Sequence, residues 1–182
     1  DASGLRPDVV GTLAAQIGIP DGVALDFARR RLTVRGAASG EWIASLGAAV
    51  DRLPEVRERD FSALVATEQM LFDGLVARMD VLDIPFADET LPTAAARGEL
   101  DGAVVGVRRG LELAAMLGRT LQVRTLGLTD EVGTEAYNRD LRERRALWLA
   151  DALRRQVPDL AVESYTPDPA VDPRAAQKRR AA

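Results

Sequence analysis

An acidic and a basic side chain lie on either side of a predicted strand–turn–helix junction. Residues 121–126 alternate between apolar and polar side chains, which is typical of a half-buried strand, and Thr129 and Asp130 follow it. Thr134 is a suitable helix N-cap, and residues 136–156 are rich in the Ala, Leu, Arg and Glu that favour helix. The segment therefore predicts a carboxylate at a strand end, directly before a long helix.

The predicted helix carries the complementary cation. Asn138, Leu141 and Arg145 are spaced so that they share one helix face, which we expect to turn back toward Asp130. A carboxylate and a guanidinium held close together can bind a zwitterionic ligand, because the carboxylate accepts from an ammonium and the planar guanidinium grips a carboxylate. The alternative is an ordinary Asp130–Arg145 ion pair that ties the helix to the strand.

The order of residues in this segment has a known counterpart. Gly127-x-Thr129-Asp130-x-x-Gly133-x-x-x-x-Asn138-x-x-Leu141-x-x-x-Arg145-Ala146 resembles the core motif of the OmpA-like (MotB-type) peptidoglycan-binding domain, with every gap preserved. The resemblance implies that Asp130 takes the ammonium and Arg145 the carboxylate of diaminopimelate in the peptide stem. It also implies that Thr129, Asn138 and Leu141 belong to the ligand-binding site.

Two positions depart from the family pattern. Leu128 stands where His is commonest, and Arg142 stands where Ser is commonest. Arg142 adds positive charge beside Arg145, which would favour carboxylates over an ammonium. Arg142 is therefore an accessory binding candidate, as are Arg179 and Arg180 near the C-terminal end, where a basic frayed terminus is the alternative.

Hydrophobic periodicity predicts an α+β protein, an α/β sandwich of two small domains. Residues 1–66 form the first domain, in the order helix, strand, strand, helix, strand. That order is similar to a BON domain, which implies a non-enzymatic module that binds lipid surfaces or partner proteins; a packing domain without a ligand is the alternative. The residues that carry this resemblance are Leu32, Val34, Gly36, Ala38 and Trp42.

The rest of the chain is predicted to be a helical linker and a second domain. Residues 67–79 form the linker and residues 80–182 the OmpA-like domain, whose helices pack on one face of a mixed sheet. The elements expected in the second domain alternate between strand and helix: strand 81–86, helix 93–117, strand 121–126, helix 136–156 and strand 160–164.

Four glycines recur every four residues in the predicted helix 93–117. They are Gly98, Gly102, Gly106 and Gly110. Each costs about 1 kcal/mol relative to Ala in a helix interior, so their spacing suggests a face where another backbone approaches closely. The other domain, a protein partner or a second copy in a homodimer would fit this face, and chance on a tolerant surface is the alternative. Interleaved charged residues argue against a membrane helix.

The composition excludes several classes of function. The chain of 182 residues has no Cys and no His, which removes disulfides, thiolate catalysis, His-based triads and His or Cys metal sites. We therefore expect no enzyme, no metal and no cofactor. A net charge of −4 argues against nucleic-acid binding.

The functional prediction is a non-catalytic cell-envelope protein that binds peptidoglycan and anchors or positions an envelope assembly. The alternative is a degenerate OmpA-like domain that serves as a protein–protein interaction scaffold. No apolar run is long enough to span a bilayer, and no signal peptide is visible. Because the chain opens with Asp1 rather than Met, we expect an upstream signal or anchor to be missing. Membrane association would come only from that anchor or from the BON-like domain. The expected location is the periplasm or envelope, with the cytoplasm as the alternative.

Overall fold

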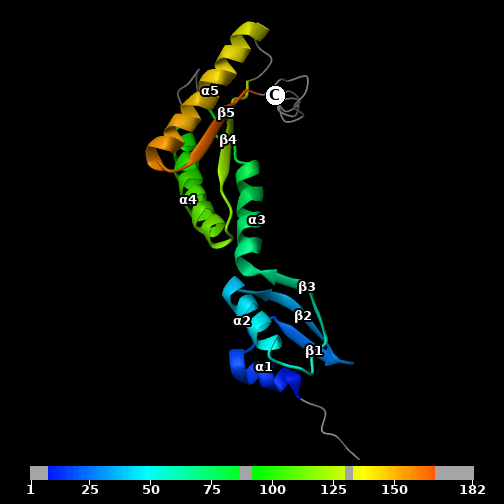
Figure 1. Cartoon of the computed structure of the whole chain (residues 1–182). Helices are drawn as coiled ribbons and strands as arrows, with labels where there is room; N and C mark the ends of the chain where they lie inside the picture. Colours follow the sequence, from blue (N-terminus) through cyan, green and yellow to red (C-terminus); the bar gives the residue numbers. More distant parts are fainter. Residues whose placement is uncertain (1–7, 87–91, 130–132, 167–182) are drawn as a thin grey trace, which may run out of the picture. The chain divides into compact units, whose positions relative to one another are not determined.

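The computed structural model describes residues 8–86, 92–129 and 133–166, drawn in colour in Figure 1. The chain divides into two compact units, Asp1–Gly74 and Leu75–Ala182. The division falls inside helix α3 (Thr67–Asp80), which covers the segment predicted to be a helical linker. Helices and strands occur in both units, so the chain is of the α+β class.

The first unit has the predicted order of helix, strand, strand, helix and strand (Figure 1). Its sheet has the strand order β1-β2-β3, with β1 antiparallel to β2 and β2 parallel to β3. The sheet is therefore mixed. The elements, in chain order, are α1 (Val9–Ile17), β1 (Ala24–Ala28), β2 (Arg31–Ala38), α2 (Gly40–Val50) and β3 (Glu58–Ala66).

The tight connection between β1 and β2 also fixes where β3 begins. Arg29 and Arg30 both have positive φ, the geometry that two-residue hairpins require. The Arg30 guanidinium donates to the carbonyl oxygens of Pro54 and Glu55, and the Arg30 carbonyl accepts from the amide of Glu58. The hairpin turn thus holds the strand that follows α2 beside β2.

Every buried residue within the described part of the first unit, residues 8–74, is apolar. β2 alternates in burial, so Leu32 and Val34 point to the side on which the helices pack. The Trp42 indole donates to the carbonyl of Gly18 at 3.0 Å, which ties α2 to the end of α1. The buried core residues are Val9, Leu13, Leu32, Val34, Leu46, Ala49 and Val50.

The second unit has two long helices and two strands. After α3 come α4 (Ala94–Met116), β4 (Gln122–Leu126), α5 (Glu135–Gln156) and β5 (Ala161–Tyr165). β4 and β5 pair in parallel as a two-stranded sheet, and α5 packs on both strands. The two strands and both helices lie within about two residues of their predicted boundaries.

The strand predicted at residues 81–86 is not formed. A single antiparallel bridge joins Phe86 to Pro92, and the preceding residues from Val81 carry no strand. Pro85 and Pro92 have no amide hydrogen to donate, which prevents a continuous ladder at this place. The predicted strand and the mixed sheet of the second domain are therefore wrong for the described residues, where the sheet is parallel.

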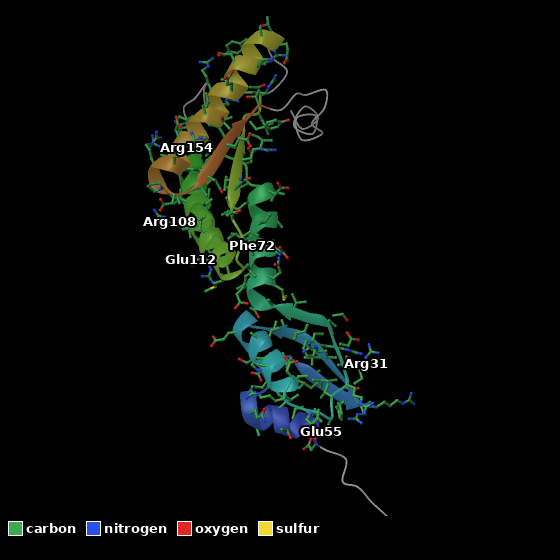
Figure 2. The ribbon with its side chains drawn as sticks, in the orientation of Figure 1. Arg31, Glu55, Phe72, Arg108, Glu112 and Arg154 are labelled. Atoms are coloured by element: carbon green, nitrogen blue, oxygen red, sulfur yellow. The ribbon has the colours of Figure 1, made fainter. Side chains whose placement is uncertain are left out.

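Two arginines fix the C-terminal end of α5 to its surroundings (Figure 2). The Arg108 guanidinium donates from α4 to the carbonyl of Gln156 at 2.9 Å. Arg154 donates to the carbonyl of Val162 at 2.7 Å and pairs with Asp151. Positive charge near the last carbonyls of a helix is favourable because it complements the helix dipole. These contacts set the direction in which the chain leaves α5 to form β5.

The core of the second unit lies between its helices and the two strands. Thr93 begins α4 as its N-cap, accepting from the amide of Ala96 at 3.0 Å. Three of the buried core residues, Leu153, Val157 and Leu160, lie in the last turn of α5 or shortly after it. The turn from α5 into β5 is therefore part of the core. The buried residues are Ile84, Ala96, Leu100, Val104, Val107, Ala152, Leu153, Val157 and Leu160.

Candidate functional site

The end of β4 is joined to α5 by a buried hydrogen bond. The Thr125 hydroxyl donates to the carbonyl of Ala146 at 2.9 Å, and Thr125 is 3% exposed. At the start of α5, the Thr134 hydroxyl accepts from the amide of Tyr137, as predicted for the N-cap. The strand end and the helix are therefore held in a defined register.

Gly127 permits a close approach between the strand end and the helix backbone. A Cβ placed on Gly127 would lie 1.7 Å from the carbonyl oxygen of Arg142 and 2.5 Å from its carbonyl carbon. Both atoms belong to the backbone of α5, so neither can turn aside. A residue with a side chain does not fit at position 127 without separating β4 from α5.

The Arg145 side chain lies against this strand end. Its Nη1 donates to the carbonyl of Leu128 at 2.8 Å, and its guanidinium carbon lies 5.2 Å from the centre of the Phe86 ring. Phe86 in turn makes an edge-on contact with Trp148, with 5.5 Å between ring centres. A cation over an aromatic face contributes about 0.5–1 kcal/mol at a partly exposed site. The arginine is thus positioned by a carbonyl and by an aromatic ring.

Phe86 and Trp148 were not predicted as parts of the site. Trp148 stands three residues after Arg145 on the same helix, a spacing that indicates neighbouring side chains. That spacing could have marked an aromatic contact. Phe86 is far from Arg145 in the sequence, and no local pattern connects the two residues.

The Arg142 side chain is buried and does not lie at the exposed edge of the candidate site. It is 6% exposed; its Nη2 lies 2.6 Å from Glu135 Oε1, and its Nη1 lies 3.4 Å from the Thr129 hydroxyl. Glu135 thus balances the positive charge that the sequence predicted beside Arg145. The accessory binding role of Arg142 stays a prediction, and it requires the side chain to leave these contacts.

The remaining predicted site residues fall into two groups. Asn138 and Leu141 are 5% and 7% exposed, so most of their surface contacts the protein itself. Asp130, Arg179 and Arg180 lie outside the described residues. The structure therefore places Arg142 in contact with Thr129 and Arg145 against Leu128, with Asn138 and Leu141 buried on the same helix, and the Asp130–Arg145 pair stays a prediction.

The four glycines of α4 do not share one environment. A Cβ on Gly106 would lie 3.1 Å from the Met79 sulfur, and one on Gly110 would lie 3.2 Å from the Leu75 side chain. A Cβ on Gly98 or Gly102 would have no atom of the described residues within 4 Å, apart from its chain neighbours and the backbone of α4 itself. Contacts with α3, together with the Leu121 side chain at 3.0 Å from a Cβ on Gly110, thus account for the second pair of glycines and leave the first pair open.

Residues 8–86, 92–129 and 133–166 contain no group of three or more acidic side chains that could hold a metal ion. None of the helices within those ranges is long and apolar enough to cross a membrane.

Comparison with protein-family models, with curated proteins and with solved structures gives no match for this chain. The OmpA-like and BON-like resemblances therefore rest on the sequence motifs alone.

Proposed function

We propose that this chain is a non-catalytic cell-envelope protein that binds the peptidoglycan stem peptide through Asp130 and Arg145. The observation that carries the proposal is the place of Arg145, which donates to the carbonyl of Leu128 at 2.8 Å. Asp130 follows Leu128 by two residues in the sequence. An arginine anchored to the residue that stands two positions before the motif aspartate in the sequence supports a paired site for a zwitterionic ligand.

The proposed mechanism involves binding without turnover. The Asp130 carboxylate receives the ammonium of diaminopimelate, and the Arg145 guanidinium receives its carboxylate. Each charge-assisted contact contributes about 1.5–3 kcal/mol before the cost of immobilising the ligand. Binding to a single stem is therefore weak, and retention on the wall comes from many stems on one polymer. In this role the protein anchors or positions an envelope assembly in the periplasm.

A cell-wall sedimentation assay tests the proposal. The wild-type protein is mixed with purified diaminopimelate-type peptidoglycan and compared with Arg145→Ala and Asp130→Asn. We expect the wild type to sediment with the wall and each variant to bind about tenfold more weakly, as the loss of about 1.4 kcal/mol implies. Arg139→Ala is the matched control, because Arg139 is an exposed arginine of the same helix.

Two outcomes would contradict the proposal. One is a wild-type protein that stays in the supernatant at every wall concentration. The other is equal sedimentation of all four proteins with unchanged circular dichroism, which would show that the charged pair plays no part in binding.

A second candidate function is a protein-interaction scaffold. The observation that favours it is the open side of α4, which has Gly98 and Gly102 without neighbours and Val105 at 66% exposure. We expect Gly102→Leu to abolish association with a partner or with a second copy, measured by crosslinking and sedimentation velocity, while wall binding is unchanged. A crosslinked partner whose contacts avoid this side of α4 and the first unit would remove the basis of this candidate.

A further inference from the structure

Arg142 is the one buried charged side chain among residues 8–86, 92–129 and 133–166. Burial of a guanidinium is unfavourable unless hydrogen bonds and an opposite charge compensate for the lost hydration. Glu135 supplies that charge at 2.6 Å, and its own side chain is 57% exposed. The chain thus retains an energetically costly arrangement at the place where the predicted ligand-binding residues gather.

The two contacts of Arg142 lie on opposite ends of one short segment. Thr129 stands where the chain leaves the strand end, and Glu135 stands in the first turn of α5. The guanidinium has a fixed, planar set of donors, so it can hold both acceptors at a fixed separation. Lysine, with one flexible ammonium, cannot reproduce that geometry.

The backbone of Arg142 is fixed as well. Its carbonyl oxygen lies against Gly127, at a distance that leaves no room for a Cβ. The main chain of this one residue therefore contacts the strand end, and its side chain contacts both ends of the segment that follows. A shift of Arg142 would move Gly127, Thr129 and Glu135 together.

We infer that Arg142 is a positioning residue, which with Glu135 fixes the separation of Thr129 and Glu135 beside Arg145. It acts as an internal brace and does not serve as a ligand cation. The effect of Arg142 on ligand affinity rests on the peptidoglycan-binding function proposed above. Its effect on the separation of Thr129 and Glu135 does not depend on that function. A ligand at Arg145 also meets less positive charge than the sequence predicts, because Glu135 balances Arg142.

The brace is tested by NMR relaxation on the whole chain. Backbone order parameters of Thr129, Thr134 and Glu135 are measured in the wild type, Arg142→Ser, Arg142→Lys and Glu135→Ala. We expect values near 0.85 in the wild type and below about 0.6 at Thr129 and Thr134 in Arg142→Ser and Glu135→Ala. The order parameters of Arg142→Lys are expected to lie between those of the wild type and those of the other two variants. Arg139→Ser is the control, because its exposed side chain lies on the same helix.

Wall sedimentation of the same variants supplies the second measurement. We expect Glu135→Ala to bind the wall about tenfold more weakly, corresponding to about 1.4 kcal/mol, and Arg142→Lys to bind with an affinity between that of Glu135→Ala and that of the wild type. Arg142→Lys keeps a cation opposite Glu135, so it keeps the test decisive even if the variants that remove one partner of the pair do not fold.

The outcomes separate the brace from the proposed function. Unchanged order parameters in Arg142→Ser and Glu135→Ala would overturn the brace, whatever the wall assay shows. Lower order parameters with full wall binding would overturn the positioning role. If the wild type fails to bind the wall, the peptidoglycan proposal falls, and the relaxation data alone decide whether Arg142 braces the segment.

Discussion

The two compact units differ in what they bury. In the first unit the described core is apolar, and its arginine–carboxylate pairs, such as Arg31–Asp60 and Arg59–Asp51, lie at the surface. In the second unit Thr125, Asn138 and Arg142 are buried, all on β4 or α5. Surface ion pairs contribute about 0–1 kcal/mol, whereas a buried charge must be compensated locally. The second unit therefore has to satisfy buried polar groups at its β4–α5 junction, which the described residues of the first unit do not require.

The largest expected effect is a loss of stability of the second unit on substitution of Gly127, at the end of β4. Gly127→Ala places a Cβ 1.7 Å from a backbone oxygen of α5. We expect the second unit to lose more than about 3 kcal/mol of stability, at or beyond the upper end of ordinary overpacking. Urea unfolding followed by Trp148 fluorescence measures the loss.

A glycine in open surroundings provides the control for that change. Gly102→Ala adds the same methyl group to α4, where no atom lies within 4 Å. We expect it to stabilise the unit by about 1 kcal/mol, because Ala favours helix over Gly. Equal destabilisation by both substitutions would show that the close approach at Gly127 is not what makes glycine necessary there.

The next prediction concerns the stability of the first unit. Leu32→Ala removes a side chain that is fully buried in its core, and we expect a loss of about 2–5 kcal/mol. The chain has two tryptophans, Trp42 in the first unit and Trp148 in the second. Variants with Trp42→Phe or Trp148→Phe therefore follow one unit at a time. A parallel fall in the stability reported by Trp148 would show that the two units unfold as one.

A smaller loss of stability is expected when the buried hydroxyl group of Thr125 in the second unit is removed. Thr125→Val keeps the shape of the side chain but removes its hydrogen bond to the carbonyl of Ala146. We expect a loss of about 1 kcal/mol, the usual net value of one hydrogen bond. Thermal unfolding monitored through Trp148 measures it, and an unchanged midpoint would mean that this hydrogen bond does not stabilise the β4–α5 junction.

The smallest effect concerns a surface carboxylate of the first unit. Hydrogen bonds from the Ser62 hydroxyl and amide, and then from Arg31, hold the pKa of Asp60 below its ordinary value of 3.8. A lowered pKa in the folded state stabilises the fold above pH 3.8. That contribution is lost as the pH falls from 3.8 through the lowered pKa of the folded state. We expect Asp60→Asn to flatten the acid dependence of stability in this range, measured by urea unfolding below pH 5; an unchanged dependence would contradict it.

Local signals were sufficient to predict most elements of both units. The Thr134 cap and the composition of the following residues located α5, and alternation from Leu121 located β4. The α+β class follows from these periodicities. The strand predicted at residues 81–86 failed because apolar residues there suggested a strand, while Pro85 and Pro92 limit the pairing to one bridge.

The candidate site was only partly predictable. Helical spacing placed Asn138, Leu141 and Arg145 together, since that grouping depends on one helix alone. Glu135 and Arg142 are seven residues apart on α5, so spacing places them on one face, but the contact with Thr129 comes from outside the helix and spacing does not encode it. The contact of Phe86 with Arg145 likewise requires the packing of distant segments.

The parallel pairing of β4 with β5 has a consequence for folding. Gln122 lies opposite Ala161, with the whole of α5 between them in the chain. Such a pair cannot be closed by a tight turn, so the crossover through α5 has to bring the two strands together. During synthesis β4 and α5 are complete before β5 exists, and the edge of β4 is then available for wrong pairing. We therefore expect the second unit to become resistant to proteases only after Ala161–Tyr165 has been synthesised.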